Sequence, residues 1–257
     1  IESPVWLGKD GKQVNSVVSV LAGAMDIRRW AGTFKAKLAF RNDETGNLAF
    51  VDYTQGGSVV TEIEDTLNVY HPDISPDGNW VAFCTGLEGV RGKSSVYVRS
   101  LDSIGSGLVK LDVENAAIPR WRVLESGDTV IVYVTDAGNN KDESVFKQAS
   151  TWQVRFSKGK FGTPEKLFGG AYHGGVSDGN SFAVSGARLL RARVAGVDTV
   201  WYNGEQACNA SLSKDNSKQT LFLDFASRTG TDFVGKSYGA HEVAFVADSA
   251  GRLVRYV

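Results

Sequence analysis

The chain lacks long apolar runs, a net charge of either sign, and most of the residues that build metal sites. Its 257 residues include two cysteines and three histidines, and the formal net charge is -1. No stretch reaches the roughly 18 consecutive apolar residues of a membrane-spanning helix, so we expect no membrane insertion. The lysines and arginines are scattered along the chain, which argues against nucleic acid as a partner.

The few cysteines, histidines and methionines further limit which disulfides, metal sites and processing events we expect. Cys84 and Cys208 lie far apart beside apolar segments. We expect two buried free thiols, with a disulfide as the alternative. The histidines show no metal-binding spacing, so we expect no metal and no cofactor. Because the chain begins at Ile1 and its one methionine is Met25, we expect it to derive from a longer precursor.

Short apolar segments of strand length recur along most of the chain. They are Leu38–Phe40, Leu48–Val51, Trp80–Phe83, Val96–Val98 and Val130–Val134. Between them lie clusters of Gly, Asp, Asn and Ser, which tolerate the positive φ of tight hairpin turns. No sustained helical periodicity with caps is present. The pattern predicts an all-β protein with little helix and no parallel α/β sheet.

A strand-turn-strand unit is repeated along the sequence. Residues 71–83 contain a Pro-Asp-Gly turn, and residues 172–184 copy the unit with Asp-Gly-Asn in register. Residues 209–216 copy it again with Asn216 in place of glycine, a replacement that keeps access to the left-handed region. Residues 118–132 form a looser copy with a longer turn.

The spacing of these copies predicts a β-propeller. The copies begin about 35 to 55 residues apart, an interval typical of four-stranded blades. We predict one domain over residues 1–257 with five four-stranded antiparallel blades, with six blades as the alternative. The five are residues 27–70, 71–117, 118–171, 172–207 and 208–257. Residues 1–26 are then a ring-closing strand or the remnant of an upstream linker, and their pairing with Leu253–Val257 would make a sixth, partial blade.

One copy resembles a known repeat. Ile74-Ser75-Pro76-Asp77-Gly78 followed by Trp80–Phe83 is similar to the TolB-type propeller repeat, a WD-like class with a Ser-Pro-Asp-Gly turn. The resemblance covers residues 71–225. It implies a scaffold, often exported, in a family of periplasmic envelope proteins that hold protein partners and of propeller domains that gate prolyl-peptidase-like enzymes. The shared positions are turn and core positions, so the resemblance implies no catalytic residue.

A serine motif in the second copy has two interpretations. Residues 175–179 spell Gly-x-Ser-x-Gly, the nucleophile elbow, which requires a turn from strand to helix. In the repeat alignment Ser177 takes the place of Pro76, and a strand-like segment follows it. We therefore interpret Ser177 as a turn residue and expect no catalytic residue.

The beginnings of the repeated strands are the candidate binding site. In a propeller these ends surround the central channel mouth. The candidate residues are Arg28, His71, Arg120, Tyr172 and His173. Such a ring of cationic and aromatic groups suits a carboxylate, a sugar or a peptide. The alternative is that these side chains only cap strand ends.

Two sets of acidic residues are further candidates for function. Residues 136–143 are rich in oxygen ligands but lack the register of a calcium loop, so we expect a solvated loop. A propeller glycoside hydrolase would need carboxylates at the channel, for which Asp26 and Asp73 are the candidates. We prefer a non-catalytic, monomeric recognition or scaffold module of a larger exported bacterial protein, which binds a protein or a glycan at the channel mouth. The hydrolase is the alternative.

Overall fold

The computed structural model describes residues 6–7, 13–14, 23–56, 59–87, 93–215 and 217–257. The strands pair antiparallel, except that β1 (Trp6–Leu7) runs parallel to β5 (Val60–Ile63). The expected all-β class is therefore confirmed. None of the helices within these ranges has the length and apolar character needed to cross a bilayer.

The described strands form four sheets. The first contains β1, β5 and also β2 (Gln13–Val14), β3 (Lys37–Arg41) and β4 (Leu48–Asp52). The second contains β6 (Tyr70–Ile74), β7 (Trp80–Cys84), β8 (Val96–Ser100) and β9 (Val109–Lys110). The third contains β10 (Ala116–Val123), β11 (Thr129–Thr135), β12 (Ser150–Ser157), β13 (Lys160–Phe161) and β14 (Glu165–Gly169). The fourth contains β15 (Gly175–Val176), β16 (Phe182–Val194), β17 (Val197–Val200), β18 (Gln206–Leu212), β19 (Thr220–Asp224), β20 (Ala244–Ala247) and β21 (Leu253–Tyr256).

The long strand β16 joins the segments expected as the fourth and fifth blades. Its beginning pairs with β15, its end pairs with β17, and its middle pairs with β18 through Ala187, Arg188 and Leu189. From β18 to β21 the chain forms a regular antiparallel meander. The two expected segments therefore share one seven-stranded sheet.

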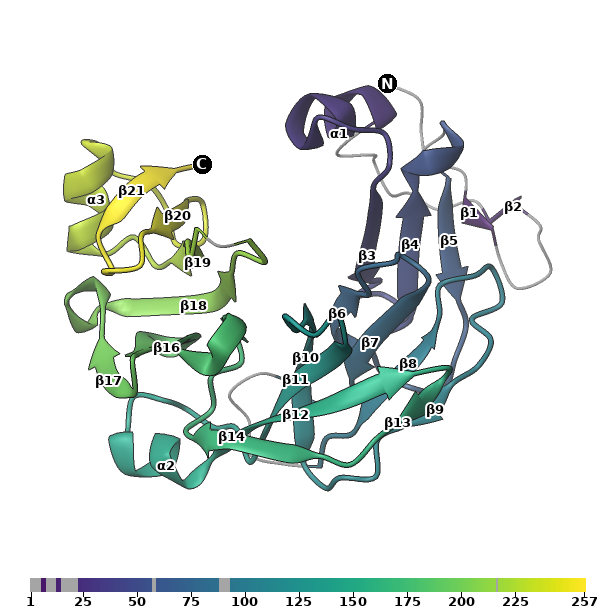
Figure 1. The fold of residues 1–257 in the computed structure, drawn as a ribbon. Helices are drawn as coiled ribbons and strands as arrows, with labels where there is room; N and C mark the ends of the chain where they lie inside the picture. Colours follow the sequence, from purple (N-terminus) through teal and green to yellow (C-terminus); the bar gives the residue numbers. More distant parts are fainter. Residues whose placement is uncertain (1–5, 8–12, 15–22, 57–58, 88–92, 216) are drawn as a thin grey trace.

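The sheets follow one another around an open arc (Figure 1). The first sheet and α1 lie at one end of the arc, and β19, β20 and β21 lie at the other. In the segment expected as a ring-closing strand, Trp6–Leu7 pairs with β5. None of its described residues pairs with β21.

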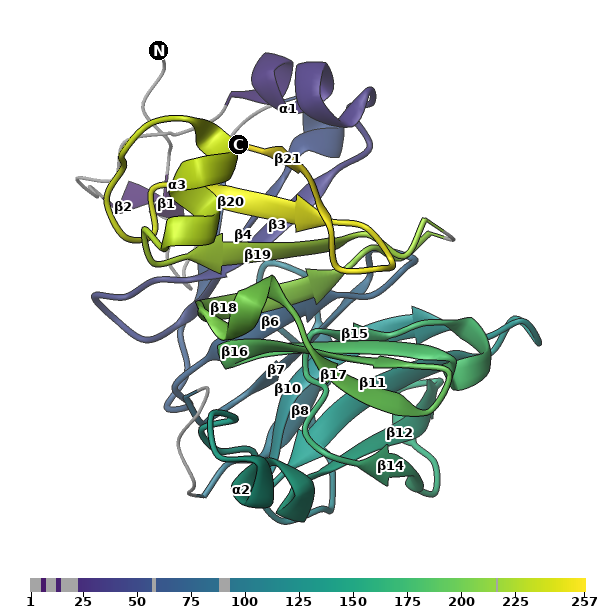
Figure 2. The ribbon, with the colours of Figure 1, turned by 90° about the vertical axis from the view of Figure 1, so that its left-hand side faces the viewer.

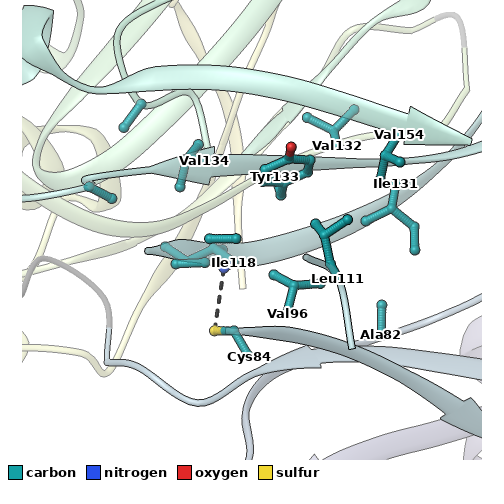
Figure 3. Close-up of a cluster of buried hydrophobic side chains, with 14 of the residues drawn as sticks. Ala82, Cys84, Val96, Leu111, Ile118, Ile131, Val132, Tyr133, Val134 and Val154 are labelled. Carbon is teal, nitrogen blue, oxygen red and sulfur yellow. Dashed lines mark hydrogen bonds between the residues drawn. The ribbon is translucent and has the colours of Figure 1, made fainter. Parts of the chain in front are cut away.

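Apolar side chains between neighbouring sheets hold the arc together. The largest buried cluster joins the second and third sheets, and Cys84, Val96, Ile118 and Tyr133 belong to it (Figure 3). The Cys84 Sγ accepts a hydrogen bond from the Ile118 N–H at 3.3 Å. Both cysteines are free thiols, as expected, although Cys208 is only half-buried. Burial raises the pKa of the Cys84 thiol, which disfavours the reactive thiolate.

Three short α-helices occur among the described residues, although no helical periodicity stands out in the sequence. They are α1 (Ala24–Ala31), α2 (Glu143–Gln148) and α3 (Arg228–Val234), and single 3-10 turns occupy Tyr53–Gln55, Asp178–Asn180 and Tyr202–Gly204. The side chains of Asp142 and Ser227 cap α2 and α3 by accepting backbone N–H bonds. These helices are too short for an apolar stripe to repeat along them.

Helix α3 lies beside β20 of the last sheet (Figure 2), and a buried carboxylate fixes it there. Asp224 at the end of β19 is fully buried and accepts hydrogen bonds from the hydroxyls of Tyr202 and Ser227, both at 2.9 Å, and of Tyr238. Burial raises the pKa of Asp224, but these hydrogen bonds outweigh it and leave the pKa below its usual value. A Cβ at Gly230 would overlap the same hydroxyls, so the network leaves room only for glycine there.

We expect Asp224→Asn to lower the free energy of unfolding by about 2 kcal/mol, because an amide accepts these hydrogen bonds less well than a carboxylate. Because the native pKa is lowered, the ionised carboxylate stabilises the fold at pH values above about 4, the pKa of an aspartate in the unfolded chain. This stabilisation is lost as the pH falls through the native pKa. Urea unfolding at pH 7 and near pH 3 checks this. A wild-type protein as stable as the variant at pH 7 would contradict it.

Candidate functional site

A cavity of about 790 Å³ lies where β6, β10, β15 and β18 converge. These are the leading strands of the repeated hairpins, and the turns that follow them complete the cavity wall. The volume falls within the range of roughly 300–1,000 Å³ typical of ligand pockets. The cavity lies toward the turns of the hairpins, whereas the expected site was at the beginnings of the strands.

The leading strands share a local distortion that aligns them. In β6, β10 and β18 the pairing register shifts, and His71, Ile118 and Asn209 adopt φ of 51°, 52° and 53° within these bulges. A positive φ is uncommon outside glycine, so its recurrence at one position marks these strands as equivalent. By this alignment Asp73 and Arg120 occupy the same position of two different strands.

The carboxylate of Asp73 is fully engaged in holding three sheets together. Its Oδ2 accepts the Trp121 N–H at 2.6 Å, and both of its oxygens accept from the Lys214 ammonium at 3.0 and 3.1 Å. The Asp73 carbonyl also accepts the Trp121 indole N–H at 2.9 Å. Trp121 belongs to the third sheet, and Lys214 follows β18 in the fourth. The function of Asp73 is therefore structural.

Arg120 and Lys218 are the cations of the cavity wall without a carboxylate partner among the described residues. Within those residues the one hydrogen bond of Arg120 runs from Nη1 to the Pro119 carbonyl at 3.4 Å, and its buried Nε has no partner. The neighbouring Arg122 differs, because its Nη1 donates to Asn180 at 2.8 Å and its Nε lies 3.5 Å from Asp178. Arg120 thus lines the cavity and has a buried donor without a partner.

Two neutral histidines lie within electrostatic reach of Arg120. Burial lowers the pKa of His71 to about 4, and the charge of Arg120 contributes to this. Burial lowers the pKa of His173 to about 3, with further contributions from His71 and Arg120. Neither side chain lines the cavity. Both imidazoles are therefore uncharged at neutral pH, and Arg120 alone supplies positive charge to this group.

The structure brings His71, Arg120 and His173 together, but not the other two candidates. Tyr172 lies in the interior rather than at the channel mouth, and its hydroxyl donates to Asp198 at 2.7 Å. It precedes β15 in the chain, and its ring packs edge-on against Phe146 and Phe168. Arg28 lies on α1, with its guanidinium 4.7 Å from the Phe34 ring, and does not line the cavity.

The sequence reasoning missed Trp121, Arg122 and Lys214, which all line the cavity. A signal for Lys214 existed, because it follows Ser213 in the third copy of the turn. Trp121 and Arg122 lie toward the end of β10, and Lys214 follows the end of β18, whereas the expected site was at the beginnings of the strands.

Ser177 is a turn residue, but its place in the repeat differs from the expected one. Its hydroxyl accepts the Phe182 N–H at 3.1 Å, just as the Ser75 hydroxyl accepts the Trp80 N–H at 2.9 Å. Ser177 therefore corresponds to Ser75 and not to Pro76. When Ser177 is aligned with Ser75, Asn180 corresponds to Gly78, and both residues have the left-handed conformation. The Asp-Gly pair of the second turn therefore lies one residue earlier than that of the first. Strand β16, rather than a helix, follows, so the elbow context is absent.

The acidic loop at residues 136–143 uses its side chains to support the fold. Asn140 exchanges hydrogen bonds with the Leu189 backbone, Asp136 accepts from Asn115, and Asp142 caps α2. Within the part of the chain that the structure describes, no group of three His, Cys, Asp or Glu side chains could hold a metal ion.

The two carboxylates considered for hydrolysis are not brought together. Asp26 lies on α1, where it accepts the Gly23 N–H at 3.2 Å and pairs with Arg29 at 3.7 Å. It does not line the cavity that contains Asp73. Hydrolysis by these two residues therefore has no geometric basis.

Comparisons with known proteins show only distant likenesses. No family model and no curated protein matches the chain. Among solved structures it is similar to the dihydro-heme d1 dehydrogenase NirN in complex with DHE, with a TM-score of 0.45 and 12% identity over 87% of this chain and 44% of that one. It is also similar to a prolyl endopeptidase, with a TM-score of 0.39 and 11% identity over 86% of this chain and 32% of that one. The chain spans less than half the length of either protein.

We expect the imidazole resonances of His71 and His173 to keep their neutral-form shifts when the pH falls from 8 to 5, because burial and Arg120 disfavour protonation. Histidines in the unfolded chain take up protons near pH 6.5, so stability falls as the pH drops from about 6.5 toward about 4. Two-dimensional NMR of ring-labelled protein measures this. Titration of either residue near pH 6.5 would contradict the arrangement described.

Proposed function

We propose that this chain is a non-catalytic recognition module with a β-propeller architecture, which binds a carboxylate-bearing protein or glycan in the cavity between its leading strands. The observation that carries the proposal is Arg120, which lines the cavity, has a buried Nε without a partner, and has no carboxylate partner among the described residues. We propose further that the module is monomeric and part of a larger bacterial protein. Its export is proposed from the resemblance at the Ser-Pro-Asp-Gly turn.

The succession of hairpins supports the propeller architecture. Leading strands with the same bulge open antiparallel sheets that follow one another around an arc (Figure 1). We propose five blades, formed by β1–β5, β6–β9, β10–β14, β15–β17 and β18–β21, in which the pairing of β16 with β18 joins the last two. A cavity lined by the leading strands then corresponds to the central channel.

The charge distribution of the cavity supports recognition of an anion. Asp73 is engaged by Lys214, and Asp178 lies beside Arg122, so these two pairs are largely balanced. The other charged residues of the wall are Arg120, Lys218, Glu125 and Asp215, and among them Arg120 has a buried donor without a partner. Charge-assisted hydrogen bonds from a guanidinium to a carboxylate are stronger than neutral ones and restrict the geometry of the ligand. A ligand carboxylate would satisfy the buried Nε of Arg120, which otherwise has the desolvation cost of an unpaired donor.

The same distribution disfavours a glycoside hydrolase. Such an enzyme needs two carboxyl groups on opposite sides of the scissile bond, one of which must gain and lose a proton. Among the cavity carboxylates, Asp73 accepts three hydrogen bonds, Asp178 is paired, and Asp215 accepts from the backbone N–H and hydroxyl of Ser217. This leaves Glu125 without a second unengaged carboxylate in the wall. We therefore expect no turnover of aryl glycosides, and Asp73→Asn should lower stability rather than a catalytic rate. Turnover that Asp73→Asn abolishes would favour the hydrolase.

We expect Arg120→Gln to weaken binding of carboxylate probes at least tenfold, because a charge-assisted hydrogen bond contributes roughly 1.5–3 kcal/mol. The probes are pooled N-acetylated peptides with free C-termini, their amidated counterparts and oligogalacturonate, measured by calorimetry at low salt. The matched control is Arg155→Gln, an exposed arginine paired with Asp128 outside the cavity. Equal binding by the Arg120 and Arg155 variants, or equal affinity for acid and amide probes, would refute the proposal.

A further inference from the structure

Helix α1 and the turn that follows it form a surface separate from the cavity. The helix lies at the outer end of the first sheet in both views (Figure 1 and Figure 2). Ala24 and Ile27 pack against the apolar cluster formed by β4, β5 and Tyr53, so this face of the helix is attached to the sheet. The side chains of Met25 and Arg29 lie on another face and are exposed.

The exposed face combines cations with apolar side chains. Met25 is 63% exposed and the side chain of Arg29 is 76% exposed, and their spacing of four residues makes them neighbours on the helix. The guanidinium of Arg28 lies 4.7 Å from the ring of Phe34, which is itself exposed in the turn after the helix. Lys35 follows and is also exposed. We call these five residues the α1 surface.

The charge of the α1 surface is largely unbalanced. The one acidic residue of the helix is Asp26, which accepts the Gly23 N–H at 3.2 Å through one oxygen, while its other oxygen lies 3.7 Å from the Arg29 guanidinium. An ion pair at this distance between exposed side chains is weak. Arg28 and Lys35 form no ion pair with any described carboxylate. The positive charge is therefore local, although the net charge of the chain is -1.

We infer that the α1 surface binds the anionic headgroups of a lipid bilayer. Cations at the level of the headgroups and apolar side chains that enter the acyl boundary are the two components of interfacial binding. A nucleic acid or another soluble polyanion would engage the cations alone, so the exposed Met25 and Phe34 favour a bilayer. The binding is peripheral, and it does not depend on Arg120, because none of the five residues lines the cavity.

The test measures cosedimentation of the wild-type chain with vesicles. Vesicles of phosphatidylcholine alone should bind little protein, whereas binding should rise with the content of phosphatidylglycerol and fall as salt is added. Glycerophosphoglycerol, the free headgroup, should not displace the protein, because it offers no acyl boundary to Met25 and Phe34. Duplex DNA should bind more weakly than the anionic vesicles for the same reason.

Variants assign the binding to the α1 surface. Arg29→Gln should lower the partition coefficient about fivefold, and Arg29→Gln with Lys35→Gln about 25-fold, since each basic residue contributes to attraction by an anionic membrane. Met25→Ser should lower it several-fold without a change in charge. The matched control is Arg155→Gln with Lys160→Gln, which removes the same charge from exposed positions of the third sheet and should keep the wild-type partition.

Each contrary outcome identifies what has failed. Equal binding to vesicles with and without phosphatidylglycerol, or equal loss of binding in the double variant and its control, overturns the α1 surface as a lipid site. Displacement by the free headgroup, or tighter binding of DNA through the same residues, also overturns it in favour of a soluble anion. The double variant should bind carboxylate probes as the wild type does, so failure of the lipid site leaves the proposed function standing.

Discussion

The arrangement of the cavity depends on the carboxylate of Asp73. It accepts a backbone N–H of the third sheet and the ammonium of Lys214 beside the fourth, while it belongs to the second. Apolar packing between sheets is non-directional, so it does not by itself fix how the leading strands face one another. Hydrogen bonds to a half-buried charge do fix this, because they restrict both distance and angle. The position of Arg120 follows from that restraint.

This restraint also explains which charges of the cavity remain available. Lys214 and Arg122 lie beside Asp73 and Asp178, whereas Arg120 shares its surroundings with two histidines that burial keeps neutral. Lys218, Glu125 and Asp215 are the other charged residues of the cavity wall. The proposed anion site therefore depends on the local surroundings of Arg120 rather than on the overall charge of the cavity.

The repeated hairpins were predictable from the sequence because each is a local feature. Turn chemistry and the alternation of apolar residues fix a strand-turn-strand unit within about 13 residues, so the all-β class and the starts of the leading strands could be predicted. The pairing of β16 with β18 was not predictable, because it depends on a contact between two hairpins. The place of Arg120 in the repeat is likewise a local feature and could be predicted. That Asp73 binds Lys214, 141 positions away, could not be predicted, because this contact joins distant parts of the chain.

The short helices and the position of Tyr172 were missed for related reasons. Helices α2 and α3 are held by caps and by Asp224, whose partners come from separate loops. Tyr172 was expected at the channel mouth because a strand begins there, but its ring packs against Phe146 and Phe168 in the interior. The most direct test of the account is the Nε–H resonance of Arg120 during titration with N-acetylglycine and its amide. A downfield shift with the acid alone is predicted, whereas a resonance that responds to neither compound would contradict Arg120 as the anion anchor.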